Sequence, residues 1–253
     1  MKLALHQGPS PAGDIDAAFD RIETLLAASA RAKADMLLLP ELFLPGYNQP
    51  EAIRALAQTP DGPWMAQVSR LAREAGCGLT LGWAERQDDA IFNAASSFDA
   101  NGDLLAHYRK IQLYGAERDI FQPGAAPPPV FRLAGHRAGL LICYDIEFPQ
   151  HAAGLAGRGA DLLLVPTANP AGFGHVPQVL VPARAHENRL TVAYANLCGD
   201  ERGLVYDGGS VVSGPDARPI VMAGRDEALM ICTLPDSWDK AVLSAQDRDY
   251  RAV

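Results

Sequence analysis

The sequence predicts an α/β protein that folds as a four-layer α-β-β-α sandwich made of two similar halves. Residues 34–40 (Ala-Asp-Met-Leu-Leu-Leu-Pro) and 160–166 (Ala-Asp-Leu-Leu-Leu-Val-Pro) share one pattern. Residues 95–107 and 210–222 share a second pattern, in the same order along the chain. Each half is expected to form a sheet with helices on one face, and two such sheets bury their bare faces by packing together. We therefore expect residues 1–253 to form one domain.

The first half is predicted to alternate strands and helices. The segment at 14–32 is rich in alanine and amphipathic, with Asp14 or Asp16 near its beginning, which is typical of a capped helix. The turn at 99–102 (Asp-Ala-Asn-Gly) indicates a hairpin whose second strand leads to Lys110. The predicted strands are 3–6, 34–40, 78–85, 91–98 and 103–109, and the predicted helices are 14–32, 51–57 and 62–75.

The second half is organised around Cys143, which follows a short apolar run. Residues 140–142 are typical of a strand buried on both faces of a parallel sheet. Pro149 suits the first turn of a following helix, and Gly-Arg-Gly at 157–159 would end that helix before an apolar run at 162–165. Cys143 is thereby placed at the carboxyl end of a strand, where open α/β sheets hold their ligands. The nearby helix N-terminus would favour a thiolate.

Composition excludes several classes of partner. The chain is 48% hydrophobic and 21% charged, which is typical of a globular protein with a substantial core. A net charge of −8 and a pI near 5.2 argue against binding to nucleic acid or an anionic membrane surface. The first apolar run is too short for a signal peptide, and no run is long enough to span a bilayer. We expect a cytoplasmic protein with no membrane or nucleic-acid partner.

The four cysteines are widely separated, at Cys77, Cys143, Cys198 and Cys232. In a reducing compartment this spacing predicts free thiols rather than a disulfide framework. There is no Cys-x-x-Cys pair, and the six histidines show no zinc-binding spacing. We therefore expect no metal site and no cofactor.

Cys143 needs a proton acceptor to act as a nucleophile, because a thiol with a pKa of about 8.5 is only a few per cent ionised at pH 7. The histidines nearest in sequence, His136 and His151, lie in the preceding segment and the following helix, where they are poorly placed for a Cys/His pair. Glu41 follows a buried strand, where desolvation would raise its pKa and make it a base. Lys110 would supply a positive charge that favours the thiolate and a developing oxyanion.

Three segments that carry these residues resemble the signature segments of the carbon-nitrogen hydrolase (nitrilase/amidase) superfamily. They are Pro-Glu-Leu-Phe-Leu-Pro-Gly-Tyr at 40–47, Tyr-Arg-Lys-Ile-Gln-Leu-Tyr-Gly at 108–115 and Cys-Tyr-Asp-Ile-Glu-Phe-Pro at 143–149. Further matching segments lie at 115–124, 184–188 and 192–196, so the resemblance spans nearly the whole chain. The fold of that family is an α-β-β-α sandwich, in agreement with the internal repeat.

The resemblance implies a role for each polar residue. Glu41 would be the general base, Cys143 the nucleophile, Lys110 the oxyanion stabiliser, and Glu117 a second acid that positions the substrate and the ammonium of Lys110. The backbone N–H of Tyr144 would help to hold the oxyanion. The implied reaction is acyl transfer from an amide through a thioester. The implied partners are a small-molecule amide and further copies of the chain, in a homodimer or a higher homo-oligomer.

Residues after the cysteine favour an amide over a nitrile. Nitrilases typically follow the cysteine with Trp-Glu, whereas this chain has Tyr144-Asp145, similar to the amidase-like branches. Glu147 stands where some members that act on acidic substrates carry an arginine, so substrates with a free carboxylate are disfavoured.

The acyl pocket is expected to lie between two loops. Asn169 and Phe173, in the glycine-containing loop 169–174, would form one side. Leu42 and Phe43, which follow Glu41, would form the other side, with Tyr47 nearby in the same aromatic loop. Such a pocket predicts a small aliphatic or aromatic amide as substrate.

The same residues permit plainer interpretations. Glu41 alone could be a solvated loop carboxylate, and Lys110 a surface charge at the end of a hairpin, because both residue types are rarely buried. Glu117 could pair with Arg118 or Arg109.

Two alternative functions remain open. One is a nitrilase or an N-carbamoyl amidohydrolase of the same fold. The other is a catalytically silent sandwich that acts as a binding subunit, in which Cys143 is simply a small buried hydrophobic residue. The polar tail at 237–253 is expected to extend over the surface or onto a neighbouring subunit.

Overall fold

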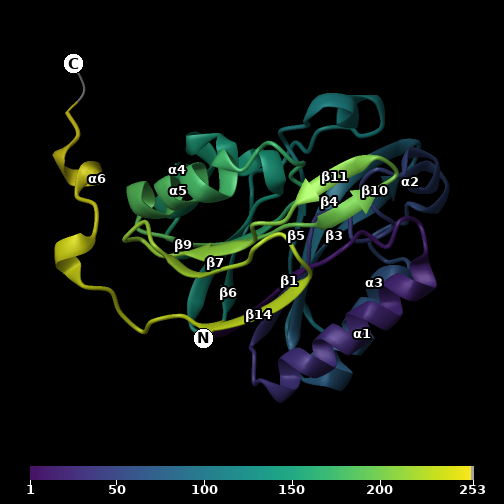
Figure 1. The fold of residues 1–253 in the computed structure, drawn as a ribbon, viewed down its shortest axis with the longest axis horizontal. Helices are drawn as coiled ribbons and strands as arrows, with labels where there is room; N and C mark the ends of the chain where they lie inside the picture. The colour runs from purple at the N-terminus through teal and green to yellow at the C-terminus, as the bar shows by residue number, and fades with distance from the viewer. Residues whose placement is uncertain (252–253) are drawn as a thin grey trace.

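The computed structural model describes residues 1–251, except for the side chain of Asp247. Two six-stranded mixed sheets face each other, and helices cover their outer faces (Figure 1). This arrangement confirms the α/β sandwich and the two similar halves predicted from the internal repeat.

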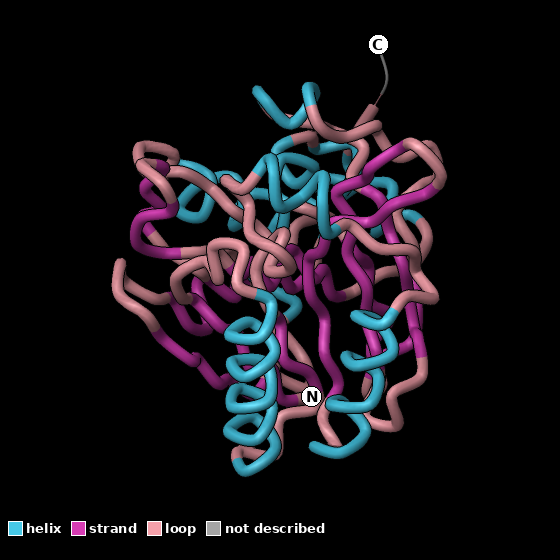
Figure 2. Tube along the Cα trace, turned by 90° about the vertical axis from the view of Figure 1, so that its right-hand side faces the viewer, coloured by secondary structure: helices cyan, strands magenta, loops and turns pink. Residues whose placement is uncertain are grey.

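The first sheet contains the strands of the N-terminal half and one strand from the C-terminal end of the chain. In spatial order it consists of β14 (Ala228–Thr233), β1 (Lys2–Gln7), β2 (Met36–Leu38), β3 (Gly78–Gln87), β4 (Ala90–Phe98) and β5 (Leu104–Arg109). Its helices are α1 (Ile15–Arg31), α2 (Pro50–Leu56) and α3 (Pro63–Ala75). Figure 2 shows α1 and α3 side by side along the strands. Strand β14 was not predicted, and it pairs antiparallel with β1.

The second sheet repeats this order with the strands of the C-terminal half. It consists of β6 (Val130–Leu133), β7 (His136–Leu140), β8 (Leu162–Pro166), β9 (Thr191–Ala195), β12 (Val211–Ser213) and β13 (Pro219–Met222). Its outer face is covered by α4 (Pro149–Gly157) and α5 (Val181–Asn188). The repeated apolar segments recognised in the sequence are therefore β2 and β8, which hold equivalent places in the two sheets.

Apolar side chains fill three layers of the sandwich. Leu5 and Leu38 from the first sheet meet Leu140 and Leu164 from the second, and all four are fully buried. Each such leucine stabilises the fold by roughly 1.5–3 kcal/mol relative to an exposed one. Separate clusters lie between each sheet and its helices.

Helix α1 begins directly after Asp14, one of the two residues predicted to lie near its cap. The side chain of Asp14 accepts a hydrogen bond from the backbone N–H of Ala17 at 3.0 Å, so Asp14 rather than Asp16 is the cap. Such a cap contributes about 1 kcal/mol to helix stability.

A short hairpin closes over one end of the sandwich. It consists of β10 (Cys198–Glu201) and β11 (Leu204–Asp207). Glu201 is buried, and its carboxylate accepts hydrogen bonds from the Ser10 hydroxyl at 2.5 Å, the Asn48 N–H at 3.0 Å and the Tyr206 hydroxyl at 2.9 Å. Glu201 therefore fixes the hairpin against the loop that follows Glu41.

The C-terminal tail contains a 3₁₀ turn at Lys240–Val242 and the short helix α6 (Gln246–Asp249). Arg189, at the end of α5, donates a hydrogen bond to the carbonyl of Ser244 at 2.5 Å, so this part of the tail is tied to its own chain. Residues 252–253 of the predicted tail lie outside the described residues. Among residues 1–251, no helix is both long enough and apolar enough to cross a membrane.

Candidate active site

Glu41 lies just beyond the carboxyl end of β2, where the two halves of the sandwich meet. Its backbone N–H donates to the carbonyl of Thr167, which follows β8, at 3.3 Å. Strand β3 passes very close to this loop, because a Cβ atom at Gly82 would lie 2.4 Å from the backbone nitrogen of Leu42 and 2.6 Å from the Cα of Glu41. Only a glycine allows this approach, so Gly82 sets the position of the Glu41 backbone.

Three donors hold the carboxylate of Glu41, which is fully buried. Oε1 accepts from the Asn93 side-chain amide and from Nζ of Lys110, both at 2.7 Å, and Oε2 accepts from the backbone N–H of Ala168 at 2.9 Å. Burial raises the pKa of Glu41 above its usual value, although the neighbouring ammonium of Lys110 opposes this shift. A carboxylate with a raised pKa, held in a fixed orientation, is suited to accept a proton.

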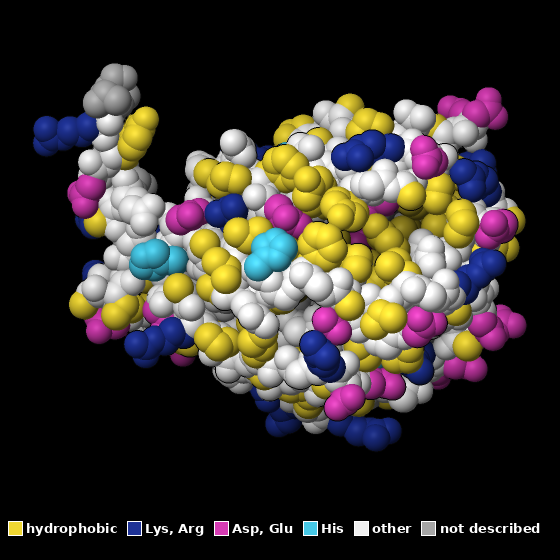
Figure 3. All heavy atoms as spheres, turned by 45° about the horizontal axis from the view of Figure 1, so that its top comes forward, with side chains coloured by type: hydrophobic (Ala, Val, Ile, Leu, Met, Phe, Trp, Pro, Cys, Tyr) yellow, Lys and Arg dark blue, Asp and Glu magenta, His cyan; other side chains and the backbone are white. Residues whose placement is uncertain are grey.

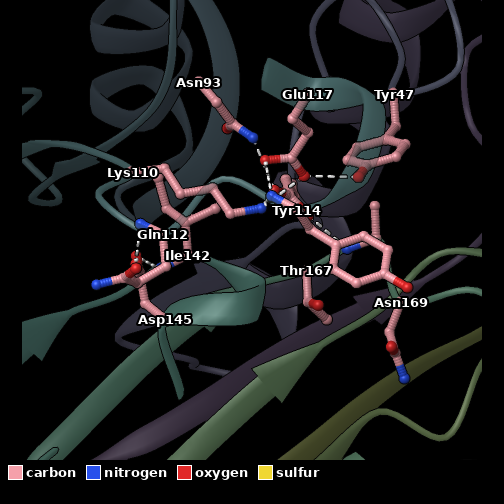
Figure 4. Close-up of polar contacts among 12 residues, drawn as sticks. Tyr47, Asn93, Lys110, Gln112, Tyr114, Glu117, Ile142, Asp145, Thr167 and Asn169 are labelled. Atoms are coloured by element: carbon pink, nitrogen blue, oxygen red, sulfur yellow. Dashed lines mark hydrogen bonds and ion pairs between the residues drawn. The ribbon is translucent and has the colours of Figure 1, made fainter. Parts of the chain in front are cut away.

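Lys110 is also fully buried and lies between two carboxylates, of which Glu117 is labelled in Figure 4. Its Nζ lies 2.7 Å from Oε1 of Glu41 and 2.7 Å from Oε1 of Glu117. Burial lowers the pKa of Lys110, but the two carboxylates outweigh this effect and raise the pKa well above its ordinary value. Lys110 is therefore a permanent ammonium in a dry site and not the surface charge of the plainer interpretation.

Glu117 is held by the 3₁₀ turn Gly115–Asp119, with its carboxylate directed at the ammonium of Lys110. Oε1 also accepts from the hydroxyl of Tyr47 at 2.6 Å, and Oε2 accepts from the backbone N–H of Tyr114 at 3.2 Å. Arg109, one of the two arginines considered as partners of Glu117, instead forms an ion pair with Glu85. Glu117 is therefore a second carboxylate, besides Glu41, that restrains the ammonium of Lys110.

Cys143 lies at the predicted elbow, where it follows β7 and is the first residue of the 3₁₀ turn Cys143–Glu147. Its φ of +44° is rare for a residue other than glycine, and such strained positions cluster at functional sites. Burial and the negative charges of Glu41 and Glu117 raise the pKa of the Cys143 thiol, whereas Lys110 and a hydrogen bond with the Thr167 side chain lower it. The net result is a thiol that stays protonated at rest, so an attack by sulfur requires a base.

Asp145 connects the elbow to the end of β5, a role that its own segment of the sequence does not indicate. Its Oδ2 accepts from the Tyr108 hydroxyl at 2.9 Å. Oδ2 also accepts from the backbone N–H of Ile142 at 3.2 Å, and Oδ1 accepts from the backbone N–H of Gln112 at 2.9 Å (Figure 4). One fully buried carboxylate thus fixes the segment that carries the lysine relative to the segment that carries the cysteine. Asp145 is a positioning residue for both.

The substitution Asp145→Ala is expected to lower the free energy of unfolding by about 2–4 kcal/mol, because each buried donor left without an acceptor costs about 1–3 kcal/mol. It should also lower kcat/KM by about 10²-fold through misplacement of the lysine and the cysteine. Urea unfolding and steady-state kinetics measure the two effects. Tyr108→Phe is the control, since it removes one of the three bonds, with an expected cost of about 1 kcal/mol. Equal effects of the two substitutions on kcat/KM would contradict the positioning role.

A small cavity of about 10 Å³ lies beside Cys143. It is lined by Tyr47, Tyr114, Cys143, Glu147, Ala168, Asn169, Pro170 and Phe173. Three of the residues expected at the substrate, Tyr47, Asn169 and Phe173, therefore lie at this cavity. The ring of Tyr144 packs edge-on against Tyr114 next to it, with the ring centroids 5.2 Å apart.

The expectation that Leu42 and Phe43 bound the acyl pocket is wrong. Neither side chain lines this cavity, and both are fully buried. Leu42 lies in an apolar cluster behind Tyr47, and Phe43 packs between the first sheet and its helices, with its ring 6.1 Å from that of His6. The chain turns at Leu42, where φ is +45°, and this turn directs the two side chains into the core.

Metal-binding side chains do not cluster in the described part of the chain. Within it, no group of three or more histidine, cysteine, aspartate or glutamate side chains is arranged so as to hold a metal ion.

Comparison with known proteins gives consistent matches over most of the chain. The hydrolase in the pqqF 5' region of Pseudomonas protegens is 44% identical over 92% of this chain and 82% of that protein. An (R)-stereoselective amidase of a Pseudomonas species is 34% identical over 99% of this chain and 89% of that protein. The amidase from Nesterenkonia sp. AN1, in a variant that shows Michael addition of acrylamide at the active site cysteine, superposes with a TM-score of 0.88 at 39% identity, over 93% of each chain.

The family model described as carbon-nitrogen hydrolase matches residues 2–241, a range that contains every residue of the candidate site described above. The chain belongs to the carbon-nitrogen hydrolase family, the nitrilase superfamily.

Proposed function

We propose that this protein is an amidase that hydrolyses the C–N bond of a small primary amide to a carboxylic acid and ammonia, with Cys143 as the nucleophile. The observation that carries the proposal is the buried arrangement in which the ammonium of Lys110 lies 2.7 Å from both Glu41 and Glu117, within the electrostatic reach of the Cys143 thiol. This arrangement supplies a base, a fixed cation and a thiol in one dry site.

The proposed reaction begins with transfer of the Cys143 proton to Glu41. The thiolate attacks the amide carbon, and the oxyanion that forms is stabilised by the ammonium of Lys110 and the backbone N–H of Tyr144. Glu41 then returns the proton to the amide nitrogen, the C–N bond breaks, and ammonia leaves. An acyl thioester remains on Cys143.

Water completes the reaction. Glu41 takes a proton from the water molecule, and the resulting hydroxide attacks the thioester carbon. The C–S bond breaks, the carboxylic acid is released, and the proton returns to the sulfur of Cys143. The low dielectric constant of the buried site strengthens the interaction of Lys110 with each oxyanion.

Relatives about 40% identical to this chain support an amide, whereas a nitrilase of Pyrococcus abyssi that is 33% identical is the reason to include a nitrile among the test substrates. The amidase from Nesterenkonia sp. AN1 is known in complex with butyramide, and it is about 40% identical to this chain. The (R)-stereoselective amidase provides a second amide-directed relative. Most of the residues around Cys143 are aromatic or apolar, which favours an uncharged, apolar acyl group.

A substrate panel tests this proposal. We expect ammonia release from propionamide and butyramide, little from butyronitrile or an N-carbamoyl amino acid, and none from any of them with the Cys143→Ala variant. Mass spectrometry of the enzyme quenched during turnover should show the acyl group on the peptide that contains Cys143.

Other outcomes would contradict the proposal. Faster turnover of the nitrile or of the carbamoyl compound would identify one of those substrate classes instead. Absence of turnover together with equally slow iodoacetamide labelling of all four cysteines would indicate a binding subunit without catalytic activity.

A further inference from the structure

Two cavities of very different size meet next to Cys143. The inner cavity has about 10 Å³, which is close to the space that one water molecule needs. Even the smallest amides contain several heavy atoms, so a substrate enters only if part of the wall moves. The residue that moves determines which neighbouring space receives the part of the substrate beyond its carboxamide group.

The outer cavity is much larger and lies on the far side of the same wall. Its volume is about 420 Å³, within the range of small-molecule sites. Its lining includes Ile120, Phe121 and Leu204, and it shares Tyr47, Tyr114 and Pro170 with the inner cavity. Hydrophobic side chains gather around a hollow on the corresponding face of the molecule (Figure 3). The outer cavity is thus a largely apolar recess adjacent to the candidate active site, with Arg54, Glu117 and Asp119 also in its lining.

Of the three shared residues, Tyr114 is the one free to move. The hydroxyl of Tyr47 is bonded to Glu117 at 2.6 Å, and the backbone of Pro170 pairs with that of Tyr206 in the β10–β11 hairpin. The side chain of Tyr114 instead packs edge-on against aromatic rings, with its centroid 5.2 Å from Tyr144 and 6.0 Å from Phe173, and the residue is 37% exposed. Ring contacts of this kind contribute only about 0.5–1.5 kcal/mol each, so rotation of Tyr114 requires little free energy.

We propose that the outer cavity binds the acyl chain of the substrate and that Tyr114 is the movable partition between it and Cys143. This inference rests on the proposed amidase function and adds the substrate class, which is a primary amide with an apolar acyl chain longer than that of butyramide. When Tyr114 rotates, the carboxamide reaches the sulfur while the chain lies along Ile120 and Leu204.

The chemistry of the reaction places the acyl side, rather than the nitrogen side, in the outer cavity. In the proposed mechanism the leaving nitrogen must receive a proton from Glu41, which lies at the buried end of the site with no exposed surface. The acyl group stays on the sulfur of Cys143 after ammonia leaves, and Cys143 lines the inner cavity that Tyr114 and Pro170 separate from the outer one. A chain that extends from the thioester carbon past Tyr114 therefore enters the outer cavity.

Filling the outer cavity with Leu204→Trp tests the inference. We expect the ratio of kcat/KM for hexanamide to kcat/KM for acetamide to fall about tenfold or more, because each excluded methylene costs about a factor of ten or more. The matched control is Val205→Trp, since Val205 is the next residue of β11, is 46% exposed and does not line the cavity. The control should leave the ratio within about twofold of that of the unchanged protein.

The outcomes separate this inference from the proposed function. If acetamide and hexanamide are both inert with the unchanged protein, the amidase function fails. If both are hydrolysed but Leu204→Trp does not change their ratio, only the outer subsite is wrong. If Leu204→Trp instead impairs N-butylacetamide selectively, the cavity holds the leaving group and the acyl assignment is overturned.

A second variant tests the partition and does not depend on the folding of the tryptophan variant. Tyr114→Ala should raise the rate at which a bulky maleimide labels Cys143, relative to the rate for iodoacetamide, by about tenfold, and Tyr114→Phe should leave this ratio within about twofold. An unchanged ratio in Tyr114→Ala would show that another part of the wall admits the substrate.

Discussion

The substitution Lys110→Met is expected to reduce kcat/KM by at least about 10³-fold. Removal of one oxyanion donor costs about 3–4 kcal/mol of transition-state stabilisation, and here the donor is a buried ammonium. The same ammonium also orients Glu41 and Glu117, which would repel each other without it. Steady-state kinetics with butyramide measure the effect, and Lys240→Met, at an exposed lysine of the C-terminal tail, is the control that should retain full activity.

Lys110→Met should also reveal the electrostatic cost of the site through its stability. Breaking a buried ion pair by removal of one partner costs about 3–5 kcal/mol, because a carboxylate is left buried without a counter-charge. The pKa of Glu41 is already raised by burial, and loss of the ammonium would raise it further. A carboxyl group whose pKa is higher in the folded than in the unfolded state does not destabilise the fold below the unfolded pKa, which is about 4.3. As pH rises from there through the folded pKa, the group lowers the free energy of unfolding.

The stability of Lys110→Met should therefore fall more steeply than that of the unchanged protein as pH rises from about 4 to 8. Urea unfolding at several pH values measures this difference. A stability loss that is the same at every pH would indicate a simple packing defect, and it would contradict the charged role of Lys110. Retained turnover would overturn the proposed mechanism.

The parts of the fold that could be predicted are those with a local signal. Strands β2 and β8 are apolar runs of the same pattern, and the polar residue that follows β2, Glu41, marks the edge of the sheet at which the site is formed. The glutamate, the lysine and the cysteine were each identified from their own segment, and the structure brings their segments together through the pairing of the sheets.

The parts that were missed depend on contacts between distant segments. Asp145 bonds to Tyr108 and Gln112, which are more than 30 residues away, so nothing in its own segment identifies it as a connection. The β10–β11 hairpin contains charged residues and glycines that are typical of a loop, and buried Glu201 is satisfied only by partners outside the hairpin's first strand. The prediction that Leu42 and Phe43 bound the acyl pocket was wrong, because the chain turns at Leu42, where φ is positive, and both side chains are buried in the core.

The substitution Glu41→Gln should abolish turnover while leaving Cys143 open to alkylation. A general base contributes about 10²–10⁴-fold, and an amide cannot accept the thiol proton, so kcat/KM with butyramide should fall by at least that factor. Since both carboxylate oxygens of Glu41 accept from donors, the new amide N–H₂ must face either Lys110 and Asn93 or the N–H of Ala168. This mismatch should lower the free energy of unfolding by about 1–3 kcal/mol.

The pH dependence gives this prediction its sharpest form. In the unchanged protein, kcat/KM should decline as pH falls through the pKa of Glu41, which burial raises above that of an ordinary glutamate. The negative charge of Glu41 also raises the pKa of the Cys143 thiol, so its removal next to the remaining ammonium should lower that pKa. The pH at which iodoacetamide labelling of Cys143 reaches half its maximal rate should therefore be lower in Glu41→Gln than in the unchanged protein. This shift should be seen although Glu41→Gln has lost turnover. Glu74→Gln, at an exposed glutamate of α3, is the control for both measurements. A Glu41→Gln protein that turns over butyramide normally, or whose thiol becomes less acidic, would show that a group other than Glu41 accepts the proton.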